Sequence, residues 1–435
     1  MGGNKGSLTL ILGSASNGSA NRSIAYDPGI GPGTDIGELE FRIRLSGPEG
    51  ARTETVRGAD TIRLSLTPGR WTIQADAYYQ GVLYAISDPL TVNVSAGGSN
   101  SAALQMQPAT KVLNEEDFGP GVTPEYRYFS ASDTPTALHD YLVSKIGVPN
   151  GNYAVIVEGT QHIILSNSLT IASYVALSLR GSGTLKLATN GSMFKLDGGS
   201  GKKLILRGPT LVGRNLTNDG ANNNASLVTV QSGAFVMYAG EIRGNTTNGT
   251  AAGGVYVEGG IFTMSGGSIS GNTALHGGGV YVCNPGSQFT MSGSAVISGN
   301  TSIESGGGVF AAASGAFTMN GGTISTNTAN DVSPYGGGGV MVDSSSFTMS
   351  GGTISGNTAS YNGGGVCVFN SSTFNMSGGI ISGANTAALG TGTALYIDGI
   401  ATAKWGVFGT WLNTFSSPVD TTIHIVDGAA VPPGW

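Results

Sequence analysis

Two sets of side chains in the second half of the chain have residue types that bind ligands. The first is an apolar stripe at the middle position of a recurring V-x-V strand. Its members are Thr229, Tyr256, Tyr281, Phe310, Met341, Cys367 and Tyr396. Aromatic rings stack on sugar rings or pack on another protein, and an apolar stripe on a surface marks a contact site. The sequence leaves open whether the first domain, a partner chain or a saccharide covers it.

The second set is a column of threonines, each placed between a buried Phe and a buried Met of the next strand. It consists of Thr263, Thr290, Thr318 and Thr348, usually with a serine two positions later. A flat grid of hydroxyl groups can bind a glycan or ice. The same residues are also ordinary solvent-facing β sequence, and that interpretation stays open.

Acid–base chemistry has fewer candidates. Glycoside hydrolysis requires two carboxylates about 5–10 Å apart. Glu258 and Asp343 share a column but lie three coils apart, which is roughly 14 Å at the spacing of β-strands. A basic patch is the alternative site, either for an acidic glycan or for a polysaccharide lyase or hydrolase. It comprises Lys195, Lys202, Lys203, Arg207 and Arg214.

No cofactor or metal is expected. The four histidines have no metal-ligand spacing, and no phosphate-binding loop is recognisable. A net charge of −6 with 11% charged residues argues against a nucleic-acid partner. Cys283 and Cys367 lie three coils apart, so we expect two separate thiols.

The elements that position these residues are repeats. Met237, Met264 and Met291 are 27 residues apart, and the spacing continues at 28, 30 and 27 residues through Met319, Met349 and Met376. A fixed period of this length is typical of a solenoid, in which stacked repeats bury one another. The 73 glycines fit turns that recur in every repeat.

One repeat predicts three short strands: V-x-V, F-x-M and a strand that begins with Ile. Alternate residues share a face, so stacking yields columns of Val, Phe, Met and Ile inside the rod. An asparagine follows the third strand in each repeat. We expect a structural ladder of amides from Asn245, Asn272, Asn300, Asn327, Asn357 and Asn385. The predicted fold is all-β: a right-handed, single-stranded parallel β-helix with three strands per coil.

The remaining domains follow from composition. Residues 1–6 form a tether, and residues 7–107 contain about seven alternating strands, as in an antiparallel β-sandwich. Residues 108–132 are expected to be a linker. Residues 133–147 predict a helix that caps the rod, with Thr134 and Pro135 at its start. Residues 148–435 form the β-helix, which ends in an aromatic plug of Trp405, Phe408, Trp411 and Phe415.

No run of residues is long and apolar enough to cross a bilayer. The start MGGNKGS is compatible with an ordinary start codon. It is equally compatible with a mature N-terminus from which a signal was removed, with a lipidated cysteine in the place of Met1. A lipid anchor is therefore a hypothesis for this end.

Two resemblances add to this interpretation. Repeats such as Gly277-Gly278-Gly279-Val280 followed by Ile297-Ser298-Gly299-Asn300 resemble the polymorphic outer-membrane protein repeats, whose pattern is GGA[ILV] with FxxN; here Ile replaces Phe. The likeness covers residues 227–390 and implies a bacterial cell-surface or secreted rod that adheres to a host protein or polysaccharide. The first domain loosely resembles small immunoglobulin-like or transthyretin-like surface modules.

The sequence thus favours a non-enzymatic adhesin or glycan-binding protein, extracellular or on a bacterial surface. The alternative is a polysaccharide-active enzyme that uses the irregular early coils around residues 195–214. Fold alone does not decide between them.

Overall fold

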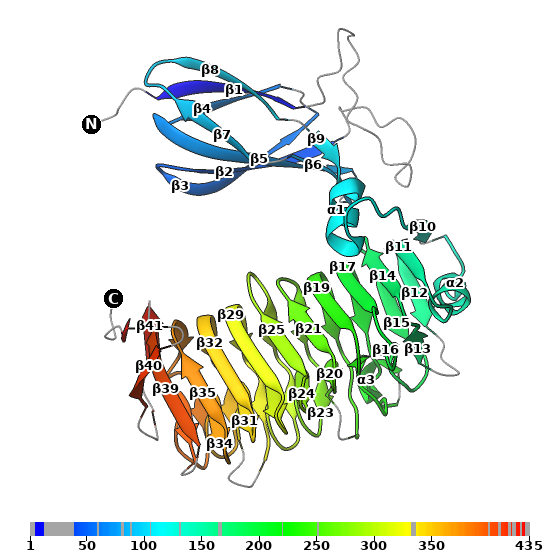
Figure 1. Cartoon of the computed structure of the whole chain (residues 1–435), viewed down its shortest axis with the longest axis vertical. Helices are drawn as coiled ribbons and strands as arrows, with labels where there is room; N and C mark the ends of the chain where they lie inside the picture. The colour runs from blue at the N-terminus through cyan, green and yellow to red at the C-terminus, as the bar shows by residue number, and fades with distance from the viewer. Residues whose placement is uncertain are drawn as a thin grey trace. The chain divides into compact units, whose positions relative to one another are not determined.

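The structure, a computed structural model, describes residues 5–12, 39–58, 61–79, 82–87, 89–104, 106–129, 132–163, 168–219, 221–249, 252–331, 336–398, 401–407, 410–415, 419, 423–426 and 429–430. The chain divides into two units, Met1–Tyr126 and Arg127–Trp435. Each is described by itself below (Figure 1).

The first unit is a β-sandwich. One sheet has the order β4-β1-β8, with β1 (Gly6–Leu12), β4 (Thr61–Leu66) and β8 (Ser99–Leu104). The other contains β2 (Glu40–Gly47), β3 (Gly50–Arg57), β5 (Gly69–Tyr79), β6 (Val82–Ser87), β7 (Leu90–Val94) and β9 (Met106–Pro108). Leucines of β1, Phe41 and Trp71 form the core between them.

The pairing in the sandwich is mixed rather than wholly antiparallel. Strand β1 pairs antiparallel with β4 but parallel with β8. Strands β1 and β8 are separated by most of the domain, so no hairpin turn dictates their relative direction.

The segment 108–132, expected to be a linker, contains helix α1 (Ala109–Phe118) and strand β10 (Glu125–Phe129). Its glycines and acidic run suggested an irregular chain, yet residues 109–118 include good helix formers. Gly119 ends the helix with a φ of 98°, and its N–H donates to the Glu115 carbonyl at 3.0 Å. This is the usual role of a glycine that follows a helix.

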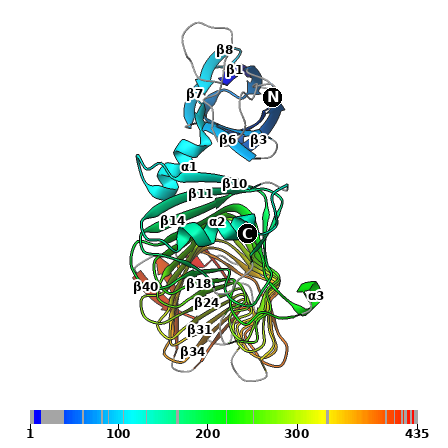
Figure 2. The same ribbon diagram turned by 90° about the vertical axis from the view of Figure 1, so that its right-hand side faces the viewer.

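Helix α2 (Ala137–Ile146) is the cap of the rod. It begins two residues later than the Pro135 start that the sequence predicts. Leu138, Leu142 and Ile146 are buried in the same core as the first coils. Figure 2 shows the helix lying across the end of the stacked strands, where it covers apolar surface that the next coil would otherwise bury.

The second unit is a parallel β-solenoid of about nine coils. The V-x-V strands form a nine-stranded sheet of β13 (Leu169–Ile171), β16 (Phe194–Leu196), β18 (Val228–Val230), β20 (Val255–Val257), β24 (Val280–Cys283), β28 (Val309–Ala312), β31 (Val340–Asp343), β34 (Val366–Phe369) and β38 (Leu395–Ile397). All eight pairings within it are parallel and in register.

The two other strands of each repeat lie in one large sheet. It contains β10, β11 (Gly151–Val157), β12 (Thr160–Ile163), β14 (Val175–Arg180), β15 (Thr184–Leu187), β17 (Lys203–Val212), β19 (Ala234–Arg243), β21 (Ile261–Met264), β22 (Ser268–Ser270), β25 (Gln288–Met291), β26 (Val296–Ser298), β29 (Ala316–Ser325), β32 (Ser346–Ser355), β35 (Thr373–Met376), β36 (Gly379–Ile381), β39 (Thr402–Val407), β40 (Thr410–Thr414), β41 (Ile423–Val426) and β42 (Ala429–Ala430). In β29 and β32 one strand runs through both parts, because Gly322 and Gly352, with φ of 88° and 93°, bend these strands without ending the sheet.

Each regular coil also has a short strand that the sequence reasoning did not include. The strands β23 (Thr273–Ala274), β27 (Thr301–Ser302), β30 (Thr328–Ala329), β33 (Thr358–Ala359) and β37 (Thr386–Ala387) form a five-stranded sheet. Three strands per coil is therefore an undercount here. This strand follows the ladder asparagine directly, and the turn then leads to the glycine triplet. A four-residue helix, α3 (Leu216–Asp219), lies in an earlier loop.

The spacing of the stacked phenylalanine rings shows how regular the coils are. The ring centroids from Phe235 through Phe262, Phe289, Phe317 and Phe347 to Phe374 are 4.7–4.9 Å apart, with interplanar angles of 4–14°. These spacings match the distance between hydrogen-bonded strands. Phe415 continues the stack at 6.1 Å, and Trp405 packs on the same core. Phe408 and the side chain of Trp411 lie outside the described residues.

The asparagine column is a continuous chain of amide hydrogen bonds. The Nδ2 of Asn272 donates to Oδ1 of Asn300, which repeats through Asn327 and Asn357 to Asn385, each bond at 3.0 Å. Each Oδ1 also accepts the backbone N–H of the preceding asparagine at 2.9–3.1 Å. Asn245 joins this chain through its backbone N–H only, at 3.1 Å.

The Asn300→Ala substitution should destabilise the solenoid by about 2–5 kcal/mol, because it leaves two buried donors of Asn272 without their acceptor. Asn320→Ala is the matched control, since Asn320 is exposed and its Oδ1 accepts from the Ser350 hydroxyl; a surface change of this kind shifts stability by about 0.5 kcal/mol or less. Urea unfolding followed by circular dichroism measures both. Equal effects of the two substitutions would contradict a structural ladder.

Candidate functional site

The apolar stripe is not an exposed surface. Phe310 is 6% exposed, Met341 1% and Cys367 0%, and with Cys283 they form a small second core. Tyr256, Tyr281 and Tyr396 are partly buried against it, and Thr229 is buried. The expectation of an outward contact stripe is therefore wrong for its centre.

The glycine triplet explains why the stripe is covered. The first glycine of each triplet has a positive φ, 68° at Gly306. A Cβ placed there would lie 2.8 Å from the Cβ of Phe310. The chain that enters each V-x-V strand thus passes directly over the side chain at its centre. Only a residue without a side chain allows this approach.

The partly buried tyrosines are held in a stack. The rings of Tyr256 and Tyr281 lie 5.3 Å apart, and those of Tyr281 and Phe310 lie 4.9 Å apart. The Cys283 thiol donates to the Tyr256 hydroxyl at 3.4 Å. Burial raises the pKa of Tyr256 and raises that of Tyr281 to about 12. Both phenols are therefore neutral donors at physiological pH.

The threonine column lies on a different sheet. Thr263, Thr290, Thr318 and Thr348 are direct register partners in consecutive strands, and each is partly exposed. The column ends at Asn375. The arrangement is regular along these strands.

The basic patch does not form one site. Lys195 pairs with the Asp197 carboxylate at 2.8 Å, and the buried Lys202 donates to the Asp197 carbonyl at 2.6 Å. Burial lowers the pKa of Lys202. Arg207 covers the ring of Tyr238 at 3.7 Å, and Arg214 donates to Asn190 at 2.6 Å. Lys203 stands on β17, not on the sheet of Lys195. These cations are engaged locally, and the proximity in sequence was misleading.

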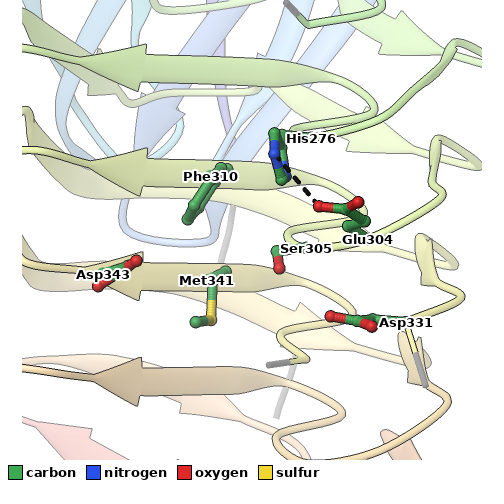
Figure 3. A pocket seen from close by; sticks show the side chains of 7 residues that line it. All are labelled: His276, Glu304, Ser305, Phe310, Asp331, Met341 and Asp343. Carbon is green, nitrogen blue, oxygen red and sulfur yellow. Dashed lines mark ion pairs between the residues drawn. The ribbon is translucent and has the colours of Figure 1, made fainter. Parts of the chain in front are cut away.

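A cleft of about 420 Å³ on the outside of the solenoid brings together groups that the sequence reasoning kept apart. It is lined by His276, Glu304, Ser305, Phe310, Asp331, Met341 and Asp343. Figure 3 shows Phe310 and Met341 on adjacent strands, with His276, Glu304 and Asp331 on one side and Asp343 on the other. The volume is in the range of small-molecule sites.

Three of these side chains form a column. His276 and Glu304 each lie two residues beyond a paired position of β23 and β27, and the Glu304 N–H donates to the Leu275 carbonyl at 2.9 Å. Asp331 stands at the same place after β30. The three positions therefore follow one another at the coil spacing of about 4.8 Å.

The column has a simple sequence signature. His276, Glu304 and Asp331 each lie four residues after a ladder asparagine, at Asn272, Asn300 and Asn327. When positions are counted from the ladder asparagine instead of from the V-x-V strand, Glu304 and Asp331 occupy the same position in adjacent coils. A comparison of positions within strands does not find this column, because it lies in a turn.

The electrostatics of the cleft are acidic. The Nε2 of His276 lies 3.4 Å from Glu304 Oε2. Burial lowers the pKa of His276, and this outweighs the opposite effect of Glu304 and Asp331. Its Nδ1 is buried and has no hydrogen-bond partner among the described residues, so a proton there would be unsatisfied. We infer a neutral imidazole whose Nε2–H faces Glu304.

Asp343 is fixed by its own neighbours. Its Oδ1 accepts from the Ser344 hydroxyl at 3.1 Å and from the Asn370 amide. Within the described part of the chain, no three His, Cys, Asp or Glu residues are grouped so that they could hold a metal ion. The carboxylates of the cleft are thus spread around its rim.

Comparison with known proteins finds no matching family model, no similar curated protein and no similar solved structure. Among the described residues, none of the helices has the length and apolar character needed to cross a membrane. The repeats therefore remain related to the outer-membrane repeats by resemblance only, and the site must be interpreted from its own geometry.

His276 should make folding stability depend on pH. The folded state lowers its pKa below the ordinary value of 6.5, so as pH falls through 6.5 the unfolded chain takes up a proton first and unfolding is favoured. Melting temperatures of the wild type and His276→Gln, measured from pH 7.5 to 5, should shift in favour of the variant as pH falls. The other three histidines are the same in both proteins, so their contributions cancel in the difference. A constant difference across this range would contradict the lowered pKa.

Proposed function

We propose that this chain is a carbohydrate-binding β-helix protein and that the His276 cleft holds one or two sugar residues of its ligand. The observation that supports this best is the composition of the cleft, which combines an apolar floor with polar groups at its rim. A pyranose has matching features, since its C–H face packs on apolar side chains and its hydroxyl groups donate to carboxylates.

Each side of the cleft has a role in this proposal. Phe310 and Met341 line the floor of the cleft with the small part of their surface that is exposed, 6% and 1%. Glu304 and Asp331 accept hydrogen bonds from hydroxyl groups. Ser305 lies next to Glu304 and lines the same cleft. The Glu304 side chain is 48% exposed, so it can reorient toward a ligand without breaking a buried contact.

The surrounding rod suits this task. Its regular coils have a stiff interior of stacked rings and amides and an exterior dominated by Ser, Thr, Asn and Gly. We further propose that the protein works outside the cell or on a bacterial surface, with a host-surface protein or polysaccharide as its partner. The resemblance of the repeats supports this location.

A second candidate function is glycoside hydrolysis in the same cleft. Glu304 and Asp331 occupy equivalent positions of adjacent coils, whose backbones are about 4.8 Å apart. Paired carboxylates about 5–5.5 Å apart are typical of hydrolases that retain configuration. This replaces the early coils as the place where an enzymatic alternative would be located.

Carbohydrate binding in the cleft predicts that the double substitution Glu304→Gln and Asp331→Asn weakens binding of a captured glycan at least tenfold. Each charged hydrogen bond contributes about 1.5–3 kcal/mol, and about 1.4 kcal/mol is a factor of ten in Kd. Glu241→Gln is the matched control. Glu241 is a partly exposed carboxylate on β19, in the large sheet, and bonds Ser270 and Arg243. A glycan panel identifies the ligand, and titration calorimetry measures its Kd.

Full binding by the double variant would place the binding site elsewhere, for example on the threonine column. Release of new reducing ends from the bound polysaccharide by the wild type, and not by the double variant, would establish the hydrolase alternative. Both experiments use the full chain.

A further inference from the structure

The turn that follows the V-x-V strand contains a residue with a positive φ in coil after coil. Glycine has this role after β16 and β18, at Gly199 and Gly233, whose φ values are 69° and 72°. In later coils the described residues with a positive φ in this turn have small side chains or are asparagine: Asn284, Ala313, Ser314, Ser344 and Asn370. Glycine adopts this conformation without cost, and asparagine visits it more readily than most residues.

Tyr174 is the exception, in the turn after β13. Its φ is 58°, and a bulky residue with a positive φ is a strained outlier. The backbone of the turn is held from both sides, because the Tyr174 N–H donates to the Ser200 carbonyl at 2.9 Å and the Tyr174 carbonyl accepts from the Gly151 N–H at 3.3 Å. The turn therefore sets the conformation, and the tyrosine side chain adds strain to it. Residues held in this way are found most often where a protein contacts a ligand.

The Tyr174 ring is held at the surface in one place. A Cβ at Gly201 would lie 2.6 Å from Cδ1 and 3.2 Å from Cε1 of this ring. One side of the ring thus rests on the backbone of the next coil, while the residue as a whole is 60% exposed. Tyr256 and Tyr281, in contrast, are partly buried against the small second core. A ring that is positioned in advance and open to solvent loses little freedom when a ligand packs on it.

Hydroxyl groups lie beside this ring. Ser173 precedes Tyr174, and its Oγ lies over Gly199, in the same loop as Gly201. Ser200 stands between these two glycines and is exposed. The turn therefore combines an open aromatic surface with short polar side chains, which matches a sugar better than a purely apolar ligand.

We propose that Tyr174 is the aromatic platform of a second saccharide site on the solenoid, and that it stacks on a β-linked hexopyranose of the glucose type. The hydroxyl groups of such a sugar are equatorial, so its axial C–H groups cover both faces of the ring and pack on an aromatic side chain. Ser173 and Ser200 supply hydroxyl groups at the edge of the platform. This inference rests on the proposed function, carbohydrate binding, and adds a binding site outside the His276 cleft.

The two sites are far enough apart to be tested separately. Strand β13 precedes Tyr174, and β28, which contains Phe310 of the cleft, is five strands further along the same sheet. At the spacing of β-strands this is roughly 24 Å. Substitutions at such a distance have effects that usually add, so the cleft can be disabled without changing the platform.

The test measures binding of two tetrasaccharides, the β-1,4 tetramers of glucose and of N-acetylglucosamine, by titration calorimetry. It uses the full-length chain with Glu304→Gln and Asp331→Asn, so that the cleft contributes little. Adding Tyr174→Asn should weaken the remaining binding of the tighter tetramer about tenfold or more. Tyr174→Phe should keep the Kd within about threefold, because the ring is retained. Tyr128→Asn is the matched control, since Tyr128 is 46% exposed on β10 and should not contribute.

Melting temperatures distinguish a ligand-binding ring from a structural one. Tyr174→Asn should keep the melting temperature of the parent protein or raise it, because asparagine adopts a positive φ more readily than tyrosine. Asparagine already occupies this turn at Asn284 and Asn370. A clear fall in melting temperature would show that the ring serves folding and would overturn the inference.

The binding outcomes separate the two proposals. Equal binding of the tetramers with and without Tyr174→Asn would overturn the platform and leave carbohydrate binding by the chain intact. Loss of all binding in the Glu304→Gln, Asp331→Asn protein would likewise overturn the platform, while supporting the cleft. If neither tetramer binds to the wild type, this inference fails, and if no glycan of the panel binds either, the proposed function fails with it.

Discussion

The buried asparagine ladder is the interaction on which the regular coils depend. From Asn272 to Asn357, each amide donates to the next one and accepts a backbone N–H from the coil before it. Buried polar groups of this kind stabilise a structure only when all their partners are present. The ladder therefore favours one register of stacking, since a coil shifted by one residue would leave amides unsatisfied.

The glycine triplet is the counterpart of the ladder. A Cβ at Gly279 would lie 3.1 Å from Nδ2 of Asn300 and 3.0 Å from a methyl group of Ile297. A Cβ at Gly278, the second glycine of the triplet, would lie 2.5 Å from the Thr301 carbonyl oxygen of the following coil. The triplet thus lets the chain pass close to the ladder on the inside and close to the stripe on the outside. Two features that look separate in the sequence serve one turn.

The sequence predicts the interior better than the exterior for a physical reason. The columns of Val, Phe, Met and Ile are fixed by the alternation of residues along each strand and by the length of the repeat. Both can be read directly from the sequence. Burial of Phe310 and Met341 depends on where a glycine turn passes, and this requires three-dimensional coordinates. The Gly, Pro and acidic residues of segment 108–132 favour a linker, whereas residues 109–118 by themselves favour the helix α1 that the structure contains.

The site follows from the ladder more than from any motif. Because the asparagines hold the following turn at one place in every coil, residues four positions later stack as a column whatever their type. The column contains His276, Glu304 and Asp331 in three successive coils, and Tyr361 and Leu389 occupy the same position after Asn357 and Asn385. The residue type at this position can thus vary while the scaffold stays constant. This is the condition under which a repeat protein acquires a binding site. The acidic residues of the column lie where Phe310 and Met341 line a cleft. This combination, rather than the repeat itself, distinguishes these coils from the other coils of the rod.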